Sequence, residues 1–305
     1  MLKILKNNWL DLGIILLILV LNLFWLPSLS YWDIYGSNKS SPENQISQFK
    51  IPPSPIVKLA NKPTTTTQNF ILVDVTTNKI LLSQNANDRI YPASTTKLIT
   101  TLTALNIYPL DEIITIDEEY SEGQNMGLKL GEKITVKSLV SALLVYSAND
   151  AAYTLAKHHP QGINGFVNQM NLLVKKYNLK NTNFTNVDGL QNENHYSSVY
   201  DLSQIGRIVI QNNIVKNTVK NTEITVSSVD GSTQHYLSST DELLKTTPEI
   251  EGLKTGWTPE AKGCFVGLIN LNGHYLISVV AQSDDRFQDT KNILNWAKQN
   301  IYWQN

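Results

Sequence analysis

Two side chains three residues apart, Ser94 and Lys97, could act as a nucleophile and its base. They follow Pro92, where the sequence predicts the start of a helix, and positions i and i+3 of a helix share a face. The positive end of the helix dipole would favour negative charge on an attacked group. A lysine with an ordinary pKa near 10.4 would need burial and nearby positive charge to lower it by about three units. The S-x-x-K pattern alone also fits a helix cap and a surface lysine, and a second copy occurs at 47–50.

Two further short motifs could complete such a site. Ser147 and Asn149, in a predicted break between two helices, offer a hydroxyl to relay a proton and an amide to fix a carbonyl. Lys254 and Thr255 end a predicted strand and could bind a carboxylate, while Gly256 leaves room for a peptide-like substrate alongside. Taken singly, each motif is also typical of a capping turn or a strand-ending turn.

The elements that must position these residues are strands at both ends of the chain around a helical middle. Strand-like segments and turn signals predict strands at 69–75, 79–82, 251–254, 264–270 and 275–281. Apolar spacing predicts helices at 97–105, 135–145, 151–157, 163–177 and 287–303. We therefore expect an α+β fold, in which one antiparallel sheet is assembled from distant segments and helices pack on its faces.

Composition excludes several classes of protein. The 305 residues include 25 Lys and Arg against 26 Asp and Glu, and 42% are hydrophobic, so the chain is neither disordered nor basic enough for nucleic acid as its main partner. The one cysteine, Cys264, excludes an internal disulfide framework and is expected to be a buried hydrophobe. The five histidines contain no H-x-x-x-H pair, so we expect no metal site.

The N-terminal region predicts export. Residues 12–29 carry no charge and are long enough to approach the thickness of a bilayer core, and Lys3 and Lys6 precede them. We expect an N-terminal transmembrane helix within residues 1–32, with the following chain outside the membrane; a cleaved secretory signal is the alternative. The polar, Pro-rich residues 33–66 are predicted to be an extracytoplasmic linker without a fold, followed by a catalytic domain over 67–305.

The order S-x-x-K, S-x-N, K-T-G, each in a fitting structural setting, is specific in a way that the single motifs are not. Over roughly residues 68–300 the chain resembles the serine D-alanyl-D-alanine carboxypeptidases, the low-molecular-mass penicillin-binding proteins. The stretches that carry the resemblance are YPASTTKLIT, NMGLKLGEKITVKSLVSALLVYSANDAA, GLQNENHYSSVYDL, EGLKTGWTPEAKG and RFQDTKNILNWA.

The resemblance implies a DD-peptidase and β-lactamase-like fold, with an antiparallel sheet flanked by helices and a helical subdomain. It also implies roles for nine residues. Ser94 would be acylated, Lys97 would accept its proton, and Ser147 with Asn149 would form the second catalytic element. Substrate binding would fall to Lys254, Thr255, Gly256, Trp257 and Arg286, with the amides of Ser94 and Trp257 forming an oxyanion hole.

Three positions need separate treatment. Arg286 fits an arginine that the family carries near the carboxylate pocket, and equally a solvated arginine before a helix. His195 matches a family position beside the site, but we expect a structural, hydrogen-bonded histidine. Asp241 departs from the family, because T-D-E-L-L here replaces the usual T-N-x-L-L and puts the local hydrogen bonding in doubt.

The expected activity is removal of the terminal D-alanine from peptidoglycan stem pentapeptides through an acyl-enzyme on Ser94, without a cofactor and with β-lactams as inhibitors. A D,D-endopeptidase, a β-lactamase or an inactive penicillin- or wall-binding module is the alternative. The E-x-x-L-N pattern of class A β-lactamases is absent between Asn149 and Lys254. The expected location is the cell membrane, with a single-pass anchor and the catalytic domain outside, or secretion if the N-terminal segment is cleaved.

Overall fold

The structure, a computed structural model, describes residues 53–58 and 60–304. The predicted membrane helix and most of the predicted linker lie outside the described residues. Within the part that is described, no helix combines the length and apolarity needed to cross a membrane. The chain from Pro52 onward forms one compact unit, which is the subject of the following paragraphs.

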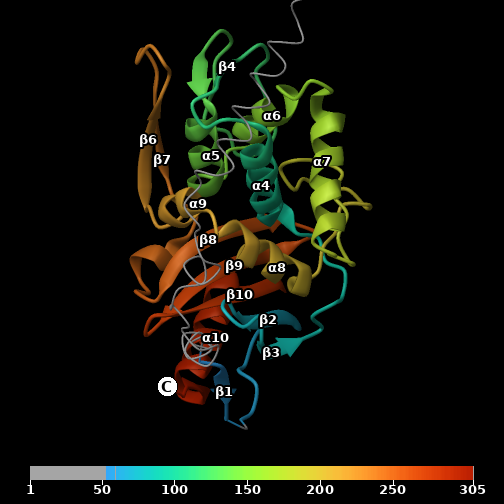
Figure 1. Ribbon diagram of the computed structural model, residues 1–305, viewed down its shortest axis with the longest axis vertical. Helices are drawn as coiled ribbons and strands as arrows, with labels where there is room; N and C mark the ends of the chain where they lie inside the picture. Colours follow the sequence, from blue (N-terminus) through green and yellow to red (C-terminus); the bar gives the residue numbers. More distant parts are fainter. Residues whose placement is uncertain (1–52, 59, 305) are drawn as a thin grey trace, which may run out of the picture. The chain divides into compact units, whose positions relative to one another are not determined.

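A five-stranded antiparallel sheet, in the order β3–β2–β10–β9–β8, forms the centre of this unit (Figure 1). Its strands are β2 (Asn69–Asp74), β3 (Ile80–Gln84), β8 (Ile250–Thr258), β9 (Lys262–Leu271) and β10 (His274–Ser283). Because β2 pairs with β10, the N-terminal hairpin joins the C-terminal strands, as the sequence predicts. Asn272 and Gly273, both with positive φ, form the predicted turn between β9 and β10.

Side chains on both faces of the sheet are buried, since strand residues alternate between two hydrophobic clusters. Along β10, Ile277 and Val279 belong to the larger cluster, and Leu276 and Val280 belong to the smaller one. Burying each such side chain contributes about 1.5–3 kcal/mol. The alternation therefore fixes the register of the central strand relative to both helical layers.

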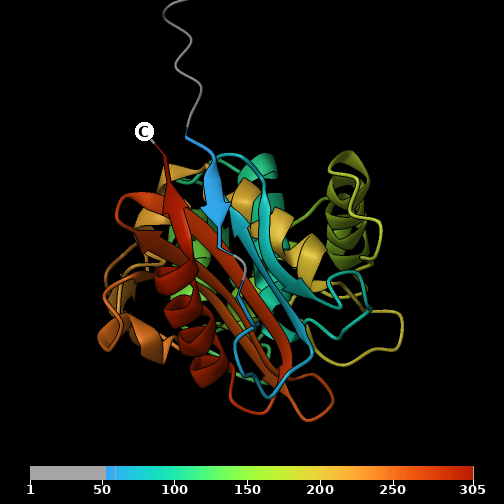
Figure 2. The same cartoon turned by 90° about the horizontal axis from the view of Figure 1, so that it is seen from below.

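Helices cover the two faces unequally. Helix α10 (Arg286–Asn300) packs on one face, against β9 and β10, and α8 (Val199–Val209) packs on the other, against β2 and β10 (Figures 1 and 2). Beyond α8 lies a helical subdomain of α4 (Lys97–Ile107), α5 (Val136–Val145), α6 (Asn149–Lys157) and α7 (Gly162–Lys176). The expected α+β architecture with a helical subdomain is confirmed.

Several shorter elements have no counterpart in the predictions from sequence. They are the strand pairs β4 (Ile113–Thr115) with β5 (Lys133–Thr135) and β6 (Glu223–Ser227) with β7 (Gln234–Ser238), the short helix α9 (Asn213–Thr218), and the 3-10 helices η1 (Ala93–Thr96) and η2 (Glu242–Lys245). Helix α8 was also missed. It begins at Ser198, whose hydroxyl accepts a hydrogen bond from Asp201 N in an ordinary N-cap.

Two expectations at the ends of this unit are wrong. Pro55–Val57, within the segment expected to carry no fold, form strand β1, and Ile301–Trp303, expected to end the last helix, form strand β11. The two strands pair antiparallel (Figure 2), because I-Y-W favours a strand and a partner with P-I-V is available. Stacking of the Trp303 ring on His274, with centroids 4.0 Å apart, fixes this end further.

Candidate active site

Ser94 and Lys97 lie where a 3-10 turn becomes a helix. Ser94 belongs to η1, and Lys97 is the first residue of α4, so the spacing of three residues brings the two side chains to one face. Lys97 Nζ donates hydrogen bonds to Ser94 Oγ and to the carbonyl of Asp188, each over 2.9 Å. A deprotonated Lys97 could therefore take the proton of the Ser94 hydroxyl directly.

The environment of Lys97 favours the neutral amine. The side chain is fully buried, and this burial lowers the pKa of Lys97 to about 8, although the charges of Asp188 and Asp150 raise it in opposition. At pH 7, one unit below that pKa, about one-tenth of the molecules carry a neutral Lys97. Burial thus provides most of the depression that a general base requires.

Ser147 lies in the predicted break between α5 and α6, and Asn149 lies at its end, where α6 starts. Ser147 has a φ of +69°, a left-handed conformation that is uncommon for a residue with a side chain, and is typical of strained functional sites. Asn149 begins α6, and its Nδ2 donates to the carbonyl of Glu122 over 3.0 Å. A Cβ on Gly123 would lie 2.2 Å from that nitrogen, so the loop passes over Asn149 only because residue 123 is glycine.

Asp150, which sequence reasoning did not single out, holds the same loop in place. Its carboxylate accepts hydrogen bonds from the backbone N–H groups of Met126, Gly127 and Leu128, over 3.0, 2.8 and 3.1 Å. Three such bonds to one buried carboxylate form a rigid link between α6 and the loop. Asp150 directly follows the S-A-N motif in the sequence. Its role could not be predicted from there, because its partners lie 22 to 24 residues earlier in the chain.

Strand β8 carries Lys254, Thr255 and Gly256 beside the nucleophile. The Thr255 hydroxyl is hydrogen-bonded to the Thr240 hydroxyl over 2.6 Å. A Cβ on Gly256 would lie 2.8 Å from the backbone nitrogen of Ser94, so the strand can approach this closely only with glycine at that position. The K-T-G motif and the S-x-x-K motif, separated by more than 150 residues, therefore meet at this contact.

Lys254 is a second buried lysine of the site. Its Nζ donates to the carbonyl of Thr255 over 3.0 Å. Burial lowers the pKa of Lys254 well below its ordinary value, and the charges of Lys97 and Arg286 lower it further. Lys254 therefore lies within electrostatic range of both the proposed base and Arg286.

A cleft of about 270 Å³ joins these elements. Its wall includes six of the predicted side chains, which are Ser94, Ser147, Asn149, Thr255, Trp257 and Arg286. Trp257 is 61% exposed and lies at the rim, whereas Lys97 and Lys254 are buried. Arg286 starts α10, and its Nε has no hydrogen-bond partner among the described residues. The predicted residues thus converge on one cleft, with polar groups on several sides.

His195 is structural, in agreement with the expectation. Its Nδ1 accepts a hydrogen bond from Thr185 N over 3.1 Å, which places the proton on Nε2, where it donates to the Thr96 hydroxyl over 2.8 Å. Burial lowers the pKa of His195 to about 4, so the ring is neutral near pH 7. Cys264, also as expected, is buried in β9, and burial raises the pKa of its thiol to about 11.

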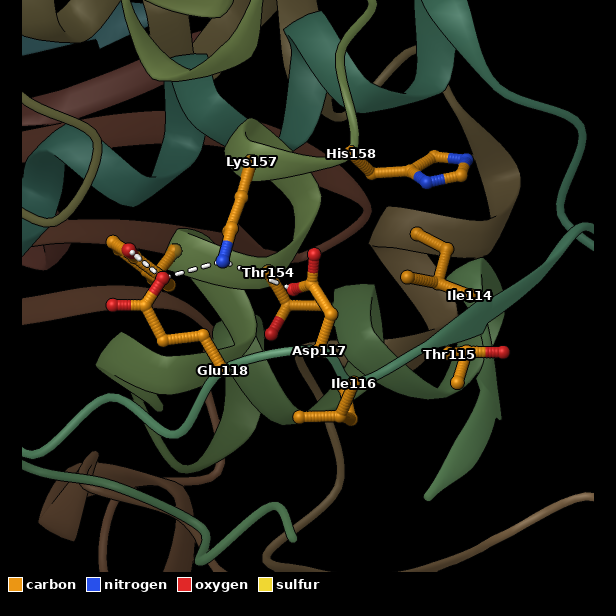
Figure 3. A pocket seen from close by; sticks show the side chains of 9 residues that line it. Ile114, Thr115, Ile116, Asp117, Glu118, Thr154, Lys157 and His158 are labelled. Atoms are coloured by element: carbon orange, nitrogen blue, oxygen red, sulfur yellow. Dashed lines mark hydrogen bonds and ion pairs between the residues drawn. The ribbon is translucent and has the colours of Figure 1, made fainter. Parts of the chain in front are cut away.

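A smaller hollow, of about 50 Å³, contains none of the predicted site residues (Figure 3). In it, Lys157 pairs with Asp117 and Glu118. Tyr153, which also lines this hollow, donates to Glu118 and stacks on Tyr120 with centroids 4.5 Å apart. The hollow is a partly exposed ion-pair cluster whose lysine is paired with two carboxylates.

Tyr120 connects this cluster to the base. Its hydroxyl donates to Asp188 Oδ2 over 2.9 Å, and the Asp188 carbonyl in turn accepts from Lys97. Gly189, with a φ of +89°, lets the Asp188 turn pass against η1, since a Cβ there would lie 1.9 Å from the Ala93 carbonyl oxygen. Asp188 and Gly189 therefore form a buried turn against η1 that carries the carbonyl acceptor of Lys97, and the partners of this turn are too distant in sequence to be anticipated.

Known proteins with similar sequences point to the same chemistry. The chain is 32% identical over 221 residues to the D-alanyl-D-alanine carboxypeptidase DacF of Bacillus subtilis. The aligned residues make up 70% of this chain and 56% of DacF. It is 31% identical to DacA of Haemophilus influenzae, over 78% of this chain and 63% of that protein. The chain thus spans less than two thirds of the length of these relatives.

The fold has solved counterparts as well. The crystal structure of the Streptomyces K15 DD-transpeptidase matches with a TM-score of 0.73 and 29% identity, over 78% of this chain and 98% of that one. Residues 56–285 match the model of the S11 peptidase family, which is described as D-alanyl-D-alanine carboxypeptidase. That match includes the S-x-x-K, S-x-N and K-T-G motifs. The chain therefore belongs to the S11 peptidase family of D-alanyl-D-alanine carboxypeptidases.

Proposed function

We propose that this protein is a serine D-alanyl-D-alanine carboxypeptidase that removes the terminal D-alanine from peptidoglycan stem pentapeptides. The observation that carries the proposal is the 2.9 Å hydrogen bond between the buried Lys97 Nζ and Ser94 Oγ at the wall of the cleft. A nucleophile and a base with a depressed pKa, joined by one hydrogen bond, are the minimum that acyl transfer from a peptide requires.

In the acylation step, neutral Lys97 accepts the Ser94 proton while Oγ attacks the carbonyl carbon of the penultimate D-alanine. The backbone amides of Ser94 and Trp257 would stabilise the oxyanion, a contribution of about 2.7–4 kcal/mol for each donor. The contact between Gly256 and Ser94 N supports this assignment, because it brings β8 beside that amide. Collapse of the intermediate breaks the peptide bond, and the leaving amine takes a proton, which releases D-alanine.

The remaining groups bind and orient the substrate. Lys254, Thr255 and Arg286 would hold its terminal carboxylate through charge-assisted hydrogen bonds. Ser147 would relay the proton to the leaving amine, and Asn149 would hold a carbonyl of the stem peptide. A water molecule then hydrolyses the acyl-enzyme and regenerates Ser94.

Labelling with a fluorescent penicillin tests the nucleophile. The purified full-length chain should gain the mass of one opened β-lactam, and Ser94→Ala should abolish the gain. Labelling that persists in Ser94→Ala would refute the assignment of Ser94.

Substrate assays separate the alternatives. A pentapeptide that ends in D-Ala-D-Ala should release free D-alanine. Cleavage of cross-linked dimers alone would instead identify an endopeptidase, and rapid turnover of penicillin would identify a β-lactamase. Because the similar Streptomyces K15 protein is described as a DD-transpeptidase, transfer of the acyl group to an added amine should be measured in the same reaction.

We also propose that the N-terminal segment anchors the protein in the cell membrane and places the catalytic unit outside the cytoplasm. The support is the uncharged run at 12–29 behind Lys3 and Lys6. Membrane fractionation followed by N-terminal sequencing tests this proposal. A mature protein that starts after residue 29 would show a cleaved signal instead.

A further inference from the structure

Asp241, the residue that replaces the family's usual asparagine, is a buried carboxylate next to the cleft. It is 5% exposed and precedes η2, where its Oδ1 accepts a hydrogen bond from Leu243 N over 2.9 Å. The helix cap therefore survives the replacement of an amide by a carboxylate. Asp241 Oδ2, in contrast, is buried without a hydrogen-bond partner among the described residues. A cap alone does not explain a buried charge, since an asparagine provides the same oxygen.

The surroundings of Asp241 provide a reason for the charge. The neighbouring Thr240 is hydrogen-bonded to Thr255, which places Asp241 close to the strand position of Lys254. Within the described part of the chain, neither Lys254 nor Arg286 takes part in a salt bridge. A buried lysine beside a half-buried arginine, without a paired carboxylate, would be repelled by it and would lose its proton more easily.

The pKa shifts of Asp241 and Lys254 agree with this geometry. The charge of Asp241 raises the pKa of Lys254, in opposition to burial, Lys97 and Arg286. Burial raises the pKa of Asp241 itself to about 6, although the two cations lower it. The other groups that act on these residues are Glu242 from the same 3-10 helix, Cys264 from β9, and Asp285 at the start of α10. Cys264 is neutral near pH 7, and neither Glu242 nor Asp285 is among the charges that shift Lys254.

We propose that Asp241 is a positioning residue that keeps Lys254 protonated behind the carboxylate-binding wall of the cleft and so extends the activity to higher pH. The inference rests on the proposed function, because it assigns Lys254 to the substrate carboxylate. Asp241 acts only through Lys254 and Arg286 and has no direct part in the chemistry.

The test compares the pH dependence of acylation by a fluorescent penicillin in the full-length wild type, Asp241→Asn and Glu242→Gln. Asparagine keeps the cap oxygen and removes the charge, so the alkaline limb of the Asp241→Asn profile should move to lower pH by about one unit or more, the scale on which one nearby opposite charge shifts a pKa. Glu242→Gln is the matched control, since it removes an exposed charge from the next position, and its alkaline limb should stay in place. Coincident limbs in Asp241→Asn and wild type, or equal shifts in both variants, would overturn the proposal.

An NMR titration of Lys254 tests the inference without relying on enzymatic activity, and its first result comes from the wild type, so it does not depend on the folding of a variant. In protein with ¹³C-labelled lysine Cε, with the Lys254 signal assigned by its loss in Lys254→Arg, the wild-type Lys254 resonance should show an inflection near pH 6 as Asp241 ionises. In Asp241→Asn this inflection should vanish and the pKa of Lys254 should fall. A wild-type signal without the inflection would refute the role of Asp241. If wild type reacts with no penicillin at any pH, the proposed function fails, and this titration still decides the charge coupling.

Discussion

The pH dependence of Ser94 acylation follows directly from the environment of Lys97. Because only the neutral amine can accept the Ser94 proton and the pKa of Lys97 is about 8, the neutral fraction is about 0.01 at pH 6, 0.1 at pH 7 and 0.5 at pH 8. The second-order rate constant for acylation by a fluorescent penicillin should therefore rise about tenfold from pH 6 to pH 7 and about fivefold to pH 8. Stopped-flow measurement between pH 5.5 and pH 9.5 gives this profile.

Asp188→Asn perturbs the profile in a defined direction. The charge of Asp188 raises the pKa of Lys97, so its removal should move the acid limb to lower pH by about one unit. The rate at pH 6 should then rise about tenfold, and the rate above pH 9 should stay the same. Asparagine retains the backbone carbonyl that accepts from Lys97 and one side-chain oxygen for the Tyr120 hydroxyl, and it gives up the acceptor that Leu190 N uses.

Tyr120→Phe is the matched control, because it removes the hydrogen bond to Asp188 and leaves the negative charge in place. Its acid limb should not move to lower pH. Two results would refute the reasoning. A wild-type rate that is constant between pH 6 and pH 8 would show that Lys97 is not the base, and an unmoved limb in Asp188→Asn would show that charge does not set its pKa.

Two further predictions concern packing and stability. Gly256→Ala puts a Cβ 2.8 Å from Ser94 N, so it should lower the free energy of unfolding by about 1–3 kcal/mol and slow penicillin labelling; unchanged labelling and melting temperature would contradict the close approach of β8. For Lys97, the folded pKa of about 8 lies below the ordinary 10.5, so the unfolded chain binds more protons and wild-type stability rises with pH across that window. Lys97→Met should therefore be more stable than wild type at pH 7 by up to about 3 kcal/mol, a gain that shrinks toward pH 10.5. Urea denaturation at both pH values checks this, and an equal difference at the two would contradict it.

The parts of the site that sequence predicts are those set by local spacing. The Ser94–Lys97 pair follows from one turn of helix, and the break around Ser147 follows from two helical patterns that stop and restart. The pairing of Ser94 with Gly256 needed the resemblance to a known family, because no local rule joins residues so far apart. Among the strands, the long buried runs of β2, β9 and β10 were found, and the short β6 and β7, which are mostly exposed, were not.

The residues that were not predicted from the sequence were missed for a common physical reason. Asp150, Asp188 and Tyr120 act through backbone groups or through partners 22 to 91 residues away, so their types reveal nothing before the chain is folded. Asp241 differs, since its departure from a familiar motif was visible in the sequence. Its consequence for Lys254 became apparent only with the burial and the unpaired oxygen.

The pairing of β1 with β11 determines how the catalytic unit would respond to a pull on its N-terminal side. Tension transmitted from an upstream attachment would first reach three residue pairs between Pro55–Val57 and Ile301–Trp303, and then the hydrogen bonds of Thr66 to the Asp289 carboxylate. None of these contacts belongs to the five-stranded sheet or to the helix that carries the nucleophile. Loss of these contacts would therefore remove none of the hydrogen bonds that join Lys97 to Ser94 and to Asp188, and none of the pairings of β8.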